Sequence, residues 1–304
     1  MANLKSIRKR ISSVKSTQKI TRAMKMVAGA RLNRAQQRIT ALRPYAVTTG
    51  RVLREVVGQA VGETADHPLL ALREDKRVLY VVVTSDRGLC AAFNSNINKA
   101  AELAWRQAEA EGKEVQLAVI GRKGRDYFRR RNAPIYHVFK DVWDNLGVES
   151  ARAVARTVLR PFLRGEVDAI YLVYNEFKSA MSQTVVVEPL FPLKVDSAGR
   201  DDAANAEGAS SVEAGQRSEF IFEPGRTQLL EHLVPTYVEI TLLRALYESM
   251  ASELGARMTA MDSATKNATE MIDRLSLTYN RARQAAITTE ILEIIGGAEA
   301  LKQG

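Results

Sequence analysis

The sequence predicts an α+β protein in which the two ends of the chain form a long antiparallel coiled coil around an inserted α/β domain. Three observations predict this fold: apolar residues recur at alternate steps of four and three in the last eighty residues, the same repeat occurs near the start, and β-branched runs alternate with helical patterns between them. We expect an N-terminal helix at 1–58, an α/β domain at 76–193, a flexible acidic loop with a short edge strand at 194–222, and a C-terminal helix at 225–304.

The composition fits a rod attached to a small globular domain. Of 304 residues, 46% are hydrophobic but only 6% are aromatic, and Lys and Arg outnumber Asp and Glu by 44 to 35. This excess of positive charge favours an acidic partner. The single cysteine, Cys90, excludes an internal disulfide, and the three histidines lie too far apart for metal-ligand spacing. No signal peptide or membrane-spanning apolar run is present, so we expect a soluble protein on the cytosolic side.

The N-terminal helix carries a strong positive charge. Residues 1–54 contain fourteen Lys or Arg and no Asp or Glu, and the first acid is Glu55. Taken alone, this pattern is equally typical of a transit peptide, a nucleic-acid-binding arm, a solvated basic face or a protein-binding shaft. The matching repeat at the other end of the chain favours the shaft.

The N-terminal repeat changes character in its middle. The seam is polar at Gln18, Thr21 and Lys25. Neighbouring Ile20, Met24 and Val27 carry apolar character onto an adjacent face, so we expect the packing to change there. Pro44 is expected to kink the helix rather than end it, because the apolar pattern resumes beyond it.

The central segment reads as a doubly wound, Rossmann-like α/β domain. The run from Arg77 to Thr84 is typical of a buried parallel strand, followed by a turn at Gly88 and a helix capped by Asn94. Further strands are predicted at 115–120, 135–139, 169–174 and 184–189, with helices at 94–111, 122–130 and 148–163.

This domain shows no nucleotide-binding motif. The loop at 85–90 lacks the second and third glycines that let backbone approach a pyrophosphate, and residues 121–124 are not a Walker sequence. We therefore expect no cofactor and no metal, and we interpret the domain as a scaffold in which Asp86 or Arg87 satisfies local partners.

The C-terminal region begins after a loop at 196–218 that is too poor in apolar residues to fold on its own. Phe220 to Phe222 is a candidate edge strand, and Pro235 is expected to bend or separate the first turns of the helix. From Leu233 to Thr289, the positions at alternate steps of four and three follow the apolar repeat, and the exceptions are Arg244, Thr265 and Thr289. Such a long seam requires a partner helix, which the N-terminal repeat supplies.

Three motifs resemble the γ subunit family of F-type ATP synthases. They are Ile20 to Ala28 (ITRAMKMVA), Ser85 to Cys90 (SDRGLC) and Tyr279 to Thr288 (YNRARQAAIT), in the same order along nearly the whole chain. The middle motif departs from the family pattern at Ala91, where a glycine is common. The acidic loop resembles an insertion relative to shorter bacterial members.

The resemblance implies a non-catalytic rotary shaft with four kinds of partner: the α and β subunits of the catalytic hexamer, the ε subunit and the membrane c-ring. It places Met24, Lys25 and Arg257 opposite loops of the β subunits, and Arg283, Gln284 and Thr288 at an upper contact with one β subunit. It also implies that an apolar tip lies in a sleeve of the hexamer, comprising Ile287, Ile291, Leu292, Ile294 and Ile295.

Two other functional classes stay open at this point. A basic coiled-coil protein that binds nucleic acid would show salt-sensitive binding and stacking aromatics, but the first 44 residues contain no aromatic residue. A cofactor enzyme would need a phosphate-binding loop that the α/β segment does not contain.

Overall fold

The computed structural model describes residues 4–58, 73–192 and 226–302. The expected loop and edge strand at 194–222 lie outside these residues. The chain forms two compact units: unit 1 comprises residues 1–30 and 257–304, and unit 2 comprises residues 31–256. Two long helices, α1 (Leu4–Gly58) and α5 (Arg226–Lys302), contribute to both units.

Unit 2 contains one five-stranded sheet in the order β3-β2-β1-β4-β5. β1 (Arg77–Val83) lies at its centre, between β2 (Glu114–Ile120) and β4 (Ala169–Phe177), and pairs with both in parallel. β3 (Ile135–Phe139) is parallel to β2 at one edge, and β5 (Gln183–Phe191) is antiparallel to β4 at the other. The β-branched run of β1 is buried on both faces, which agrees with the parallel strand predicted for it.

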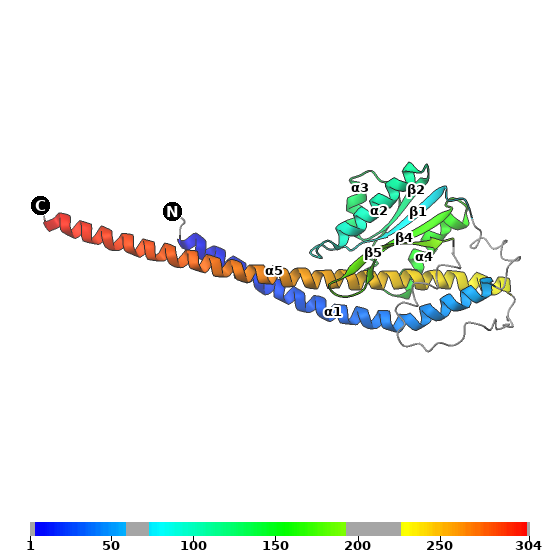
Figure 1. Cartoon of the computed structure of the whole chain (residues 1–304), viewed down its shortest axis with the longest axis horizontal. Coiled ribbons are helices and arrows are strands. Elements are labelled where there is room, and N and C mark those ends of the chain that lie inside the picture. Colours follow the sequence, from blue (N-terminus) through cyan, green and yellow to red (C-terminus); the bar gives the residue numbers. More distant parts are fainter. Residues whose placement is uncertain (1–3, 59–72, 193–225, 303–304) are drawn as a thin grey trace. The chain divides into compact units, whose positions relative to one another are not determined.

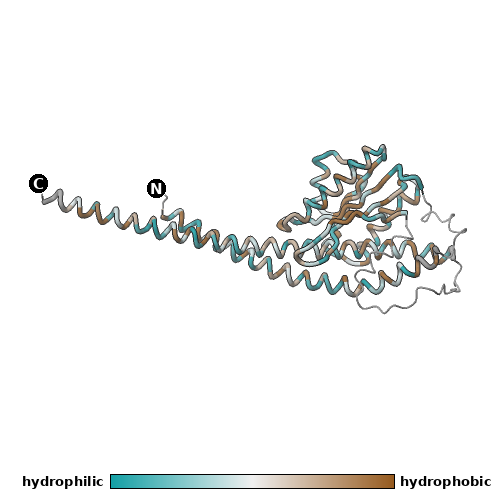
Figure 2. Tube along the Cα trace, in the orientation of Figure 1, coloured by the Kyte–Doolittle hydropathy of each residue, from teal (hydrophilic) through white to brown (hydrophobic). Residues whose placement is uncertain are grey.

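Helices cover both faces of this sheet (Figure 1). α2 (Phe93–Ala110) and α3 (Arg122–Arg129) lie on one face, and their apolar residues form a core with the strands. α4 (Val148–Leu163) lies on the other face, together with the unit 2 parts of α1 and α5. The strands between these layers are the most hydrophobic part of the unit (Figure 2).

Within unit 2, α5 uses two faces at once. One face meets α1, where Tyr237 lies beside Gly50 and the Arg38 guanidinium lies 5.8 Å from the centre of the Tyr247 ring. A second row, containing Val234, Val238, Leu242 and Leu246, is fully buried in the core beneath the sheet. The apolar repeat predicted from Leu233 and Tyr237, at alternate steps of four and three, lies only on the first of these faces.

Both prolines of the long helices lie inside continuous helix: α1 includes Pro44 and α5 includes Pro235. Of the two alternatives at Pro235, separate first turns are therefore excluded, while the bends expected at Pro235 and Pro44 stay predictions. Among the described residues, no helix combines the length and hydrophobicity needed to cross a bilayer.

One local prediction in the α/β domain is also wrong. The residue before α2 is Ala92, without a side-chain cap, whereas the Asn94 side chain accepts a hydrogen bond from the Ser85 backbone N–H at 3.0 Å. In the loop after β1, Leu89 (φ 65°) and Ala91 (φ 46°) lie in the left-handed region. A non-glycine residue in this conformation is strained, and hydrogen bonds from Asn94 to the loop support it here.

Candidate functional site

Unit 1 is an antiparallel pair of helices, and it carries every residue that the family resemblance assigned to partner contacts. α1 contributes its residues up to Ala30, and α5 contributes residues from Arg257 onward. Opposed residues have numbers that add up to about 287, as in Lys25 with Asp262 and Gly29 with Met258. The predicted antiparallel coiled coil is therefore confirmed.

The middle of this seam consists of consecutive polar pairs. The Gln18 amide donates a hydrogen bond to the Thr269 hydroxyl at 2.7 Å, and the Thr21 and Thr265 hydroxyls lie 2.8 Å apart. Next, the Lys25 ammonium donates to Asp262 Oδ1 at 2.5 Å. The polar interruptions of the two helices thus face one another, so the seam continues in register.

The expected change of packing onto the neighbouring apolar face is consequently wrong. Of the three residues expected there, Ile20 and Val27 are more than half exposed and Met24 is partly buried. Met26 is more than half exposed as well. Sequence periodicity could not detect that Thr21 and Thr265 would pair, because it treats every polar residue as a defect of the seam.

Asp262 is a functional candidate that the sequence analysis missed. Its second oxygen, Oδ2, lies 3.1 Å from the ammonium of Lys266, one turn along the same helix. Hydrogen bonds from Lys25 and Lys266 lower the pKa of Asp262, so this carboxylate is charged at neutral pH. The available signal was an acid at a position opposite Lys25 in the antiparallel register.

The remaining assigned residues lie far apart along the pair. Met24, Lys25 and Arg257 lie at the end of unit 1 where the polar pairs occur, while Arg283 falls opposite the first described turn of α1 by the same register. Arg283, Gln284 and Thr288 are exposed, and the Thr288 hydroxyl donates to the Gln284 carbonyl of its own helix at 2.9 Å. The assigned residues therefore lie in two separate stretches of the helix pair rather than in one site.

The tip of α5 extends past the described start of α1 (Figure 1). Its five large apolar side chains are between 46% and 71% exposed, namely Ile287, Ile291, Leu292, Ile294 and Ile295. A group of exposed aliphatic side chains at one helix end is typical of a surface that a partner covers.

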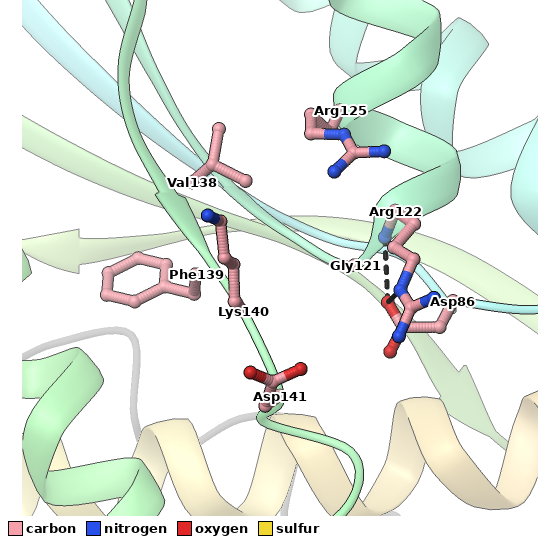
Figure 3. Close-up of a pocket in the computed structure, with 8 residues that line it drawn as sticks. All are labelled: Asp86, Gly121, Arg122, Arg125, Val138, Phe139, Lys140 and Asp141. Carbon is pink, nitrogen blue, oxygen red and sulfur yellow. Dashed lines mark hydrogen bonds and ion pairs between the residues drawn. The ribbon is translucent and has the colours of Figure 1, made fainter.

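The α/β domain has a polar cavity of about 320 Å³ at the carboxyl ends of its strands. It is lined by Asp86, residues 121–122, Arg125 and residues 138–141, with α3 on one side and the end of β3 on the other (Figure 3). Such edges bind phosphates when helix N–H groups are free. Here the first N–H groups of α3 are occupied: Arg122 N donates to Asp86 Oδ1 at 2.8 Å and Gly124 N to Thr84 Oγ1 at 2.9 Å.

A buried charged cluster joins α5 to the sheet within unit 2. The Arg244 guanidinium lies 3.3 Å from Glu188 and 4.0 Å from Glu248, and the Tyr174 hydroxyl donates to Glu188 at 3.3 Å. Burial raises the pKa of Glu248 to about 7, and Glu176 and Glu188 add to this while Arg244 and Arg43 oppose it. In the described part of the chain, Glu248 Oε2 is buried without a hydrogen-bond partner. Arg244 thus interrupts the apolar repeat of α5 because its side chain belongs to this charged cluster.

No group of three or more His, Cys, Asp or Glu side chains among the described residues could hold a metal ion. Polar and charged side chains with defined partners are found both in the exposed helix pair of unit 1 and in the buried cluster of unit 2.

Comparison with known proteins identifies the family. Residues 3–301 match the protein family described as ATP synthase. The ATP synthase gamma chain of Sorangium cellulosum (strain So ce56) is 59% identical, with 100% of both chains covered, and that of Geobacter sp. (strain M21) is 47% identical, with 99% of this chain and 100% of the relative covered.

Solved structures agree in fold. The central stalk and c-ring structure of the Tetrahymena thermophila mitochondrial ATP synthase matches with a TM-score of 0.58 and 26% identity, covering 81% of this chain and 99% of the other. The OSCP/F1/c-ring structure from Euglena gracilis matches in fold with a TM-score of 0.63 and 22% identity, covering 98% and 94%. From the match over nearly all its length and the identity to these relatives, the chain belongs to the ATP synthase gamma chain family.

Proposed function

We propose that this chain is the central rotary shaft of an F-type ATP synthase, coupling proton flow through the membrane c-ring to ATP synthesis or hydrolysis at the β subunits. The observation that carries the proposal is the 59% identity to an ATP synthase gamma chain over the full length of both chains. Its partners are the α and β subunits of the catalytic hexamer, the ε subunit and the c-ring. No observation favours a nucleic-acid-binding function.

The shaft acts because it contacts each of the three β subunits differently. A single asymmetric helix pair inside a ring of three equivalent β subunits cannot touch all three in the same way, so each orientation stabilises a different set of β conformations. This difference is the coupling free energy between rotation and chemistry. The acid-free stretch of α1 from Lys5 to Arg54 suits acidic loops on β, because attraction between screened charges allows the contact to slide.

We assign three contact regions on this basis. Met24, Lys25 and Arg257 face loops of the β subunits, and Arg283, Gln284 and Thr288 engage one β subunit higher on the axis. The exposed aliphatic side chains of the tip, from Ile287 to Ile295, lie in an apolar sleeve of the hexamer, which accounts for their exposure in the isolated chain.

The chain itself performs no catalysis in this proposal. The occupied N–H groups at the start of α3 and the absence of a phosphate-binding sequence support a scaffold role for the α/β domain. We place the protein on the cytoplasmic side of a bacterial inner membrane, attached peripherally through the complex. The purified chain should therefore show no ATP hydrolysis.

The proposal is tested by reconstituting the chain with the α and β subunits of its own organism. We expect Arg283→Ala with Gln284→Ala to lower ATP turnover by at least about thirty-fold, since polar groups on β lose hydrogen bonds worth about 1 to 3 kcal/mol each. The melting temperature of the isolated chain should not change, because both side chains are exposed.

Arg281→Ala is the matched control, because Arg281 is also exposed and lies two residues earlier on the same helix. Its turnover should remain near that of the unmodified complex. Normal assembly with an unchanged rate in the double variant would contradict the proposal.

A further inference from the structure

Lys25 is held by its own chain at the point where the proposed shaft faces a β subunit. Its ammonium donates to Asp262 Oδ1 across the seam at 2.5 Å, and this pair is flanked by the hydrogen-bonded threonines Thr21 and Thr265. The pair therefore lies at a fixed level of the helix pair, in a segment whose register is set by neighbouring polar contacts.

This ion pair is accessible from outside. The Lys25 side chain is 44% exposed and that of Asp262 is 34% exposed. An ammonium on a flexible four-carbon stem offers three donors, and in this pair one of them is directed at Asp262 Oδ1. An exposed pair of this kind contributes little to folding, so it can be exchanged for another carboxylate without unfolding the helices.

The Asp262 carboxylate still has a cationic neighbour when the Lys25 ammonium moves away. Its Oδ2 remains 3.1 Å from the Lys266 ammonium, which lies on the same helix. The carboxylate thus keeps a cation in either arrangement, and the cost of releasing Lys25 is lower than for an isolated pair.

The same stretch of α1 also exposes apolar side chains. Ile20, Met26 and Val27 are all more than half exposed. At about 3.6 residues per turn these positions lie on other faces of the helix than Lys25, so a partner that contacts Lys25 recognises it there by charge.

We propose that Asp262 is a positioning residue that holds the Lys25 ammonium across the seam and competes for it with an acidic group of a β subunit. The inference rests on the proposed shaft function and specifies how one of its contacts is regulated. In orientations without an acidic neighbour, Lys25 stays on Asp262. In the orientation that presents one, Lys25 transfers to it while Lys266 retains Asp262.

The test is a double-mutant cycle in the complex reconstituted with α and β, using Asp262→Asn, Lys25→Gln and both together. Asp262→Asn removes the competitor, so Lys25 binds the β carboxylate more tightly and that orientation lasts longer. We expect ATP turnover to fall by about two- to five-fold, the range of an exposed ion pair. The same substitution should have no effect in the Lys25→Gln background, and Asp262→Glu should retain the unmodified rate.

Controls separate this role from a structural one. Asp273→Asn removes an exposed acid further along the same helix and should leave turnover unchanged. The inference is overturned if Asp262→Asn has the same effect with and without Lys25, or if its effect on turnover follows a loss of melting temperature. Chains that do not assemble with α and β would overturn the proposed function and the inference with it.

Discussion

Two acids on the same helix, Glu248 and Asp262, both lie beside cations, but their pKa values shift in opposite directions. Glu248 lies in unit 2, where its side chain is 15% exposed and burial raises its pKa to about 7. Asp262 lies in unit 1, where hydrogen bonds from two lysines lower its pKa. The comparison teaches that a neighbouring cation determines the charge of an acid only where solvent remains available to both.

The same contrast applies to the two stretches of α5 as a whole. In unit 2 the helix buries a full apolar row against the sheet, whereas in unit 1 it pairs polar side chains with α1 along the seam. Stability should therefore concentrate in unit 2, and unit 1 should tolerate substitution. The predictions below test this difference.

The largest effect is expected from Leu242→Ala. Leu242 is fully buried in the core beneath the sheet, so the substitution should lower the free energy of unfolding by about 2 to 5 kcal/mol. Urea denaturation of the isolated chain measures this change. Leu277→Ala on the exposed surface of α5 is the control and should cost less than about 0.5 kcal/mol. Equal losses from the two variants would contradict the proposed concentration of stability.

Glu248→Gln is expected to change the free energy of unfolding by a smaller amount, and to raise it rather than lower it at pH 8. Because the folded-state pKa of about 7 lies above the ordinary value of 4.5, the folded chain binds more protons between these pH values. Stability contributed by Glu248 should thus fall as pH rises from about 4.5 to about 7 and stay level above it. The glutamine variant should be more stable at pH 8, by at most about 3 kcal/mol.

The measurement is melting temperature between pH 5 and pH 8. Glu248→Gln should flatten the profile, with a smaller slope remaining from Glu188, whose pKa is also raised by burial. Glu149→Gln, at a side chain that is 86% exposed, is the control and should leave the profile unchanged. A glutamine variant that keeps the full slope would show that another group titrates.

The smallest effect is expected from Thr21→Val combined with Thr265→Val. Each hydroxyl also lies within hydrogen-bond distance of a carbonyl of its own helix, so one hydroxyl donates across the pair while the other donates to its carbonyl. Replacing both by methyl groups of the same shape leaves no unpaired side-chain polar atom at the pair. The free energy of unfolding should change by less than about 1 kcal/mol. Thermal melting of the chain checks this result. A loss comparable with that of Leu242→Ala would mean that the polar seam, rather than the buried row, stabilises the molecule.

Much of the architecture followed from periodicity. The run of β1 predicted a buried parallel strand because β-branched residues occupy both of its faces, and the four-three repeat predicted the antiparallel helices. The buried row of Val234, Val238 and Leu242 escaped detection, because a walk that follows one seam cannot report a second face of the same helix.

Features that depend on pairing across the fold could not be predicted. Thr21 and Asp262 pair across the seam with residues more than two hundred positions away, and the burial of Glu248 depends on strands that its local sequence does not specify. The left-handed backbone at Leu89 and Ala91 also gave no signal, since glycine at position 88 was the more obvious turn residue.

The separation of the paired residues also affects how the protein is made. Gln18 and Thr269 are 251 positions apart, so α1 leaves the ribosome long before its partner is synthesised. The α/β domain, whose strands and helices alternate locally, can fold while the nascent chain is still growing. Until translation approaches the last fifty residues, the acid-free start of α1 has no seam to join. A chaperone or an acidic surface of another newly made subunit could occupy it during that interval, linking the completion of the shaft to the assembly around it.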